Sequence, residues 1–81
     1  MDWLDKQQME EIQRELIRQK TALDRAQALY GTKLPTDKYN ETLYGLVKIG
    51  VGINDEDRFR TLYNAVVNGI NNRSNRNVRF F

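Results

Sequence analysis

The sequence contains neither cysteine nor histidine. These residue types supply the commonest catalytic nucleophile and general base and most transition-metal ligands, so their absence removes most catalytic and metal-binding arrangements. Disulfide bonds are excluded as well, which fits a reducing compartment. We therefore expect a protein that is not an enzyme and that needs no metal ion or other cofactor.

Long apolar runs are also missing. The longest mainly apolar stretch, residues 43–53, is interrupted by Lys48 and three glycines and is too short to cross a bilayer. The first residues are acidic and include no apolar segment of signal-peptide length. The sequence thus predicts a soluble, cytoplasmic protein that does not use a membrane as its partner.

The remaining acidic residues are not arranged as catalytic or metal-binding groups are. Glu10, Glu11 and Glu15 follow the solvated face of a predicted helix, and residues 55–57 lie where a helix dipole favours negative charge. The second group lacks the turn glycine and further oxygen ligands of a calcium loop. The glycines around Val51 are too closely spaced for a nucleotide-binding loop and follow a predicted helix where a strand is required.

The composition that is present is typical of one small folded domain. The chain has 81 residues, 40% of them hydrophobic and 10% aromatic, which argues against disorder but allows only a modest core. Acidic and basic residues nearly balance before residue 72, so the net charge of +2 comes from Arg73, Arg76 and Arg79. We predict a single domain over residues 1–71 and a basic, aromatic tail over residues 72–81.

Residues 2–31 predict one long helix. At 1.5 Å per residue it would extend about 40 Å, more than a small domain can cover, so part of its apolar stripe is expected to meet a partner. The polar interruption of this stripe resembles a polar coiled-coil core position that sets oligomer number. The stripe residues recur at spacings of three and four and comprise Met9, Ile12, Leu16, Gln19, Leu23, Ala26 and Tyr30.

Two shorter helices are predicted to follow and to pack as a hairpin against the first, giving an all-α fold of three helices. Thr36 is expected to cap the second helix and Asn54 the third. Residues 42–50 and 61–69 share the pattern Thr-Leu-Tyr-x-x-Val-x-x-Gly, which predicts similar faces on the two helices. The expected core comprises Leu43, Leu46, Val47, Phe59, Leu62, Val66 and Ile70.

Close antiparallel packing of these two helices is a further expectation. Gly45 lies inside the second helix and Gly69 inside the third. Glycine is unfavourable in a helix interior by up to about 1 kcal/mol relative to alanine, which suggests that its small size is used for packing. We predict that the two backbones approach each other at these glycines.

The leading functional hypothesis is a non-catalytic protein-binding module, such as an adaptor, inhibitor or assembly factor. Small regulators, including virus-encoded inhibitors, often have this kind of composition. Self-association through the first helix is also expected. The predicted contact residues lie on the first helix and in the tail and are Trp3, Leu4, Met9, Ile12, Leu16, Gln19, Phe80 and Phe81.

Nucleic-acid binding is the alternative. Arginines at every third position of the tail would neutralise phosphates, and a row of asparagines on the third helix would reach base edges. Three phosphate contacts give only weak, salt-sensitive binding, and the acidic start of the third helix would repel DNA. The residues that would carry this function are Asn64, Asn68, Arg73, Arg76 and Arg79.

Overall fold

The computed structural model describes residues 3–74, which form three helices and no strand, so the predicted all-α fold is confirmed. The helices are α1 (Trp3–Tyr30), α2 (Thr36–Val51) and α3 (Glu56–Ser74). Because α3 continues to Ser74, it extends past the predicted end of the domain at residue 71. The rest of the predicted tail, residues 75–81, lies outside the described residues. Within the described part of the chain, no helix is both long and apolar enough to span a membrane.

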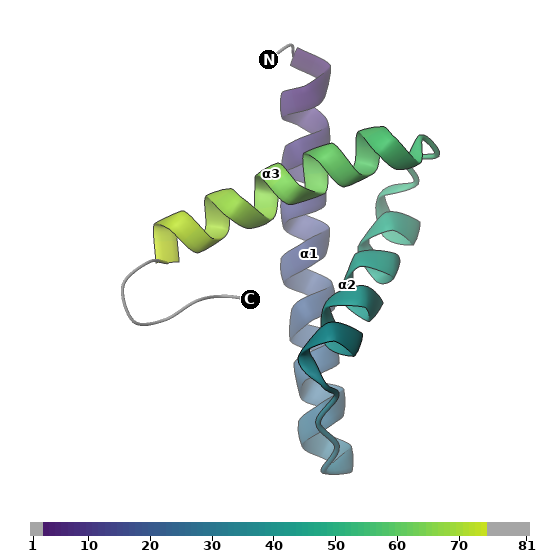
Figure 1. Cartoon of the computed structure of the whole chain (residues 1–81), viewed down its shortest axis with the longest axis vertical. Helices are drawn as coiled ribbons and strands as arrows, with labels where there is room; N and C mark the ends of the chain where they lie inside the picture. Colours follow the sequence, from purple (N-terminus) through teal and green to yellow (C-terminus); the bar gives the residue numbers. More distant parts are fainter. Residues whose placement is uncertain (1–2, 75–81) are drawn as a thin grey trace.

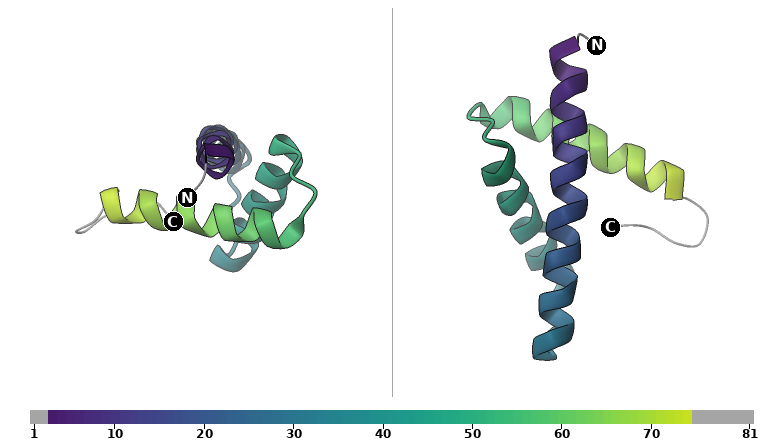
Figure 2. Two further views of the ribbon diagram at one scale, coloured as in Figure 1. Left: turned by 90° about the horizontal axis from the view of Figure 1, so that it is seen from above. Right: turned by 180° about the vertical axis from the view of Figure 1, so that it is seen from behind.

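The long helix α1 is the element against which the other two pack. Helix α2 returns along the C-terminal half of α1, and α3 crosses the N-terminal half of α1 steeply (Figure 1). The view from above shows α3 lying across α1, with α2 beside it (Figure 2). Both ends of α1 extend beyond the region that α2 and α3 cover (Figure 1).

The turn after α1 is fixed by a glycine in the left-handed conformation. Gly31 has φ 64°, and the Thr32 N–H donates to the carbonyl of Gln27 at 2.9 Å. This is the hydrogen bond of a Schellman motif, which satisfies carbonyls that the end of a helix leaves unpaired. The Gln27 side chain adds a bond from the Leu34 N–H at 2.7 Å, which holds the chain against α1 as it reverses.

The expected N-caps at Thr36 and Asn54 are each wrong by one residue. Pro35 precedes α2 without any side-chain cap, and Thr36 is the first helical residue. At α3, Asp55 is the cap, because its Oδ1 accepts the backbone N–H of Arg58 at 3.1 Å. A carboxylate at this position also interacts favourably with the helix dipole.

The core lies where α1 meets the other two helices. Five of the seven predicted core positions are buried, and Ile70 is partly buried against them. Leu46 is a wrong prediction, since it stays exposed on α2. The buried residues are Ile12, Leu16, Leu43, Val47, Ile53, Phe59, Leu62, Tyr63 and Val66.

The predicted close approach of α2 and α3 at two glycines is wrong. A Cβ added at Gly45 or Gly69 would meet nothing within 4 Å, because α3 diverges from α2 after the connecting turn (Figure 1). The close approach occurs instead between α1 and α2. A Cβ at Gly50 would lie 2.6 Å from the side chain of Glu15.

Candidate protein-binding surface

The two ends of α1 carry large apolar side chains that the rest of the fold does not cover. Trp3 is 72% exposed and Leu4 is exposed beside it at the N-terminal end. At the other end Tyr30 is 78% exposed, and Leu29 is equally open. Contiguous exposed apolar side chains of this size mark interaction surfaces on soluble proteins.

The middle of the predicted contact stripe belongs to the protein's own core. Ile12 and Leu16 are fully buried, and Met9 is partly buried against them. The structure therefore corrects the prediction that Ile12 and Leu16 face a partner, since α2 and α3 already cover them. The remaining predicted contacts, Phe80 and Phe81, lie outside the described residues.

Gln19 lies at the edge of the core, where it is only partly buried. Its Nε2 donates to Glu15 Oε2 at 2.6 Å, one turn earlier on the same helix. The amide is therefore paired within α1. Nothing about Gln19 requires a second chain to satisfy its polar group.

A second exposed apolar position lies on α2 and was missed in the sequence. Ile49 is 82% exposed, one turn after the exposed Leu46. Both are on the same side of α2 and away from the buried line of Leu43 and Val47. The spacing of three between positions 46 and 49 was the available signal for an apolar face at this point of α2. The same spacing is found among core residues, so the two cases can be distinguished only when the position of α1 is known.

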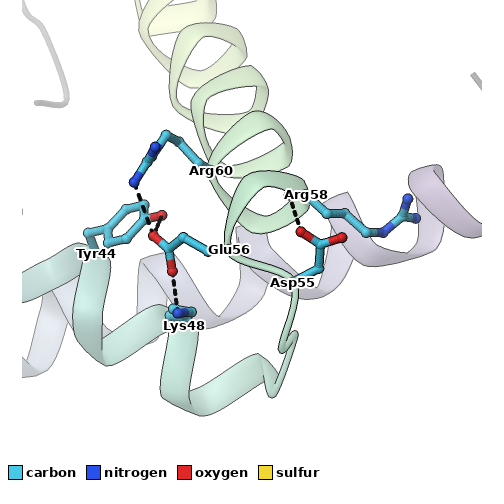
Figure 3. Close-up of polar contacts among 6 residues, drawn as sticks. All are labelled: Tyr44, Lys48, Asp55, Glu56, Arg58 and Arg60. Carbon is cyan, nitrogen blue, oxygen red and sulfur yellow. Dashed lines mark hydrogen bonds and ion pairs between the residues drawn. The ribbon is translucent and has the colours of Figure 1, made fainter.

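A cluster of charged and phenolic groups joins α2 to α3 (Figure 3). The Glu56 carboxylate accepts hydrogen bonds from the Tyr44 hydroxyl at 2.9 Å and from Lys48 Nζ. Arg60 contributes a third bond at 3.3 Å. The bonds from Lys48 and Tyr44 lower the pKa of Glu56 below its ordinary value, so this carboxylate stays ionised and fully paired at neutral pH.

Two further polar clusters join α1 to each of its neighbours. Tyr39 on α2 donates its hydroxyl proton to Asp24 Oδ1 at 2.6 Å, and Lys20 Nζ lies 2.9 Å from Asp24 Oδ2. Arg58 on α3 donates to Gln8 Oε1 at 2.7 Å and also pairs with Asp5. These groups bond one another across helix boundaries, which is what structural pairs do.

A groove of about 330 Å³ lies between α2 and α3. Two tyrosine rings and a valine give it apolar walls, and two asparagines and a glutamate add amide and carboxylate groups. The lining residues are Asn40, Glu41, Tyr44, Tyr63, Asn64 and Val67.

The structure describes only some of the residues that the nucleic-acid alternative requires. Asn64 and Asn68 are exposed on α3, and Arg73 lies in the last turn of that helix. Arg76 and Arg79 lie outside the described residues. The described residues therefore leave the nucleic-acid alternative as a prediction.

No group of three or more acidic side chains among residues 3–74 is placed to hold a metal ion. Comparisons with known protein families, curated proteins and solved structures find no match to this chain. Surface chemistry and geometry are therefore the basis for inferring its function.

Proposed function

We propose that this protein is a non-catalytic protein-binding module that contacts its partner through the exposed ends of α1. The observation that supports the proposal is the contrast along this one helix. The apolar stripe in its middle, which includes Ile12 and Leu16, is covered by α2 and α3, whereas Trp3 and Tyr30 at its ends keep more than two thirds of their surface exposed. An adaptor, an inhibitor and an assembly factor would all use such a surface.

The side chains at the ends of α1 are suited to act as binding anchors. Tryptophan and tyrosine are enriched among the residues that dominate binding energy, because they bury a large area and keep a polar group for hydrogen bonding. A helix also presents them in a nearly fixed geometry, which lowers the entropy lost on binding. Amphipathic helices that place such anchors in a partner's groove are a common recognition mode.

Self-association is part of the same proposal, with a second copy of the chain as one possible partner. The tail residues Phe80 and Phe81 are proposed as additional contacts on the evidence of the sequence. Light scattering over a concentration series tests the first point. A strict monomer at high micromolar concentration would remove self-association and leave a different protein as the partner.

Partner capture by matched variants tests the proposal directly. Trp3→Ala should reduce capture of the partner about tenfold or more, since truncating an interface anchor usually removes at least about 1.4–2 kcal/mol. Ile49→Ala is the matched control, because it truncates an equally exposed apolar side chain on α2. Both variants should unfold at the same temperature as the parent chain.

The control arm also separates the two functional classes. Capture that survives Trp3→Ala and Tyr30→Ala but is lost after nuclease treatment would refute the proposal in favour of nucleic-acid binding. Equal loss of capture with Ile49→Ala would show that the relevant surface is on α2 and not at the ends of α1.

A further inference from the structure

The groove between α2 and α3 is lined by a tyrosine whose side chain is largely buried. Tyr63 lines this groove and is only 7% exposed, with its ring 4.9 Å from that of Tyr44. Its hydroxyl forms no hydrogen bond within residues 3–74. Among the described residues, the side-chain polar atom that is both sealed from solvent and unpaired is Asn71 Oδ1, so the Tyr63 hydroxyl still reaches solvent.

Burial raises the pKa of Tyr63 to about 12, with Tyr44 and Tyr39 contributing less. The hydroxyl is therefore protonated at neutral pH and can donate one hydrogen bond and accept another. Because the hydroxyl still reaches solvent, a ligand atom that bonds it in the groove would take the place of a water molecule. The hydroxyl thus marks where a ligand's polar atom would fit.

Glu41 is the acidic residue that lines this groove, and Asp37 lies one turn earlier on the same side of α2. Neither carboxylate is in an ion pair within the described part of the chain. Glu56, which does not line the groove, is paired with Lys48 and Arg60. A cation in the groove is therefore favoured beside Glu41.

We propose that this groove binds an arginine side chain presented by a peptide segment of a protein partner. The guanidinium would lie against the aromatic wall and pair with Glu41, while the Tyr63 hydroxyl would bond a polar atom of the same peptide. Arginine fits better than lysine because its planar group both stacks on aromatic rings and donates several hydrogen bonds to carboxylate and amide oxygens. Asn40 and Asn64 supply those amide oxygens.

The arginine site would specify the kind of peptide that the protein-binding module recognises. Its biological role therefore rests on the protein-binding function proposed above. The site occupies a different surface from the ends of α1. Either proposal can therefore be wrong while the other holds, and the experiment below distinguishes these outcomes.

Titration of the ¹⁵N-labelled full chain with the peptide acetyl-Gly-Ser-Arg-Ser-Gly-amide, followed by NMR, tests the site. Amide shifts should concentrate on residues 40–44 and 63–67. A peptide with citrulline in place of arginine has the same shape without the charge and should bind at least threefold more weakly. Glu41→Gln should weaken arginine-peptide binding about three- to fivefold, as expected for an exposed ion pair.

Two control variants make the test specific. Glu11→Gln makes the same charge change at an exposed position of α1 and should leave peptide affinity within twofold. Tyr63→Phe removes only the hydroxyl and should weaken binding while the thermal unfolding temperature stays unchanged or rises. Trp3→Ala should bind the peptide as the parent chain does.

Three results would overturn the proposal: equal binding of the arginine and citrulline peptides, equal effects of Glu41→Gln and Glu11→Gln, or shifts confined to other surfaces. Shifts in the groove that grow with protein concentration alone would place a second copy there and would also overturn it. Partner capture that depends on Trp3 in the absence of peptide binding would refute the arginine site and leave the proposed function standing.

Discussion

Neighbouring residues on α1 provide a sharp test of which part of this helix is core and which is surface. Leu16 is fully buried, whereas Ile17, the next residue, is 46% exposed. Replacing a fully buried leucine with alanine removes its burial energy and leaves a cavity, for a loss of about 2–5 kcal/mol. Folded chains are stable by roughly 0.05–0.15 kcal/mol per residue, so Leu16→Ala should remove a large part of the total.

Ile17→Ala is the matched control. Its side chain loses less burial, and alanine has the higher helix propensity, so the net change should stay within about 1 kcal/mol. Urea unfolding followed by circular dichroism at 222 nm measures both variants. The unfolding temperature of Leu16→Ala should fall by at least about 8 °C, given roughly 4–8 °C per kcal/mol in a domain of this size.

The result that would refute this reasoning is equal destabilisation by the two substitutions, or a loss below about 1 kcal/mol for Leu16→Ala. Either would mean that α2 and α3 do not seal the middle of α1. Leu16 would then be available to a partner, as the sequence alone suggested. The contact surface would in that case include the whole apolar stripe and not only the helix ends.

Two further predictions concern glycine packing and acid stability. Gly45→Ala should stabilise the fold by about 0.5–1 kcal/mol in urea unfolding, because the position is helical and has open space around it. Gly50→Ala should stabilise the fold less, because its Cβ would displace the Glu15 side chain. An equal gain in stability from the two substitutions would contradict the contact between Gly50 and Glu15. Partial burial opposes the ionisation of Asp24, but hydrogen bonds from Tyr39 and a lysine outweigh it and lower its pKa below 3.8. Because the folded-state pKa of Asp24 is depressed, its ionised form stabilises the fold at pH values above the unfolded-state pKa. This stabilisation is lost as the pH falls through the folded-state pKa, so the urea concentration at the midpoint of unfolding should decrease at pH values below about 4. Asp24→Asn should flatten this part of the pH profile, and an unchanged profile would refute the assignment.

The boundaries of the helices show how far local sequence signals reach. Gly31 and Gly52 follow the last residues of α1 and α2 and adopt the left-handed conformation, which glycine takes up at little steric cost. The N-caps at Thr36 and Asn54 were each misplaced by one residue. Several adjacent polar residues have similar capping propensity, and the choice among them depends on where the chain leaves the preceding turn.

The candidate binding surfaces were harder to predict from the sequence than the helices were. The exposed Trp3 and Leu4 lie off the main stripe, which made them candidates for a contact surface from spacing alone. The exposure of Ile49 depends on which face of α2 packs against α1, and the groove beside Tyr63 depends on how α3 diverges from α2. Spacing within one helix indicates neither arrangement. Periodicity shows that a face is apolar but does not show how much of it a neighbour covers.

The sequence by itself determined that this chain is helical, which glycines lie between its helices, and that cysteine and histidine are absent. Those properties follow from spacing, turn residues and composition, which act within a few positions of each other. The tertiary structure alone decided that Leu16 is core and Ile49 is surface, and that Tyr63 opens into a groove. These outcomes depend on the crossing of α3 over α1, which is set by contacts between residues far apart in the chain and leaves no periodic signal in any one segment.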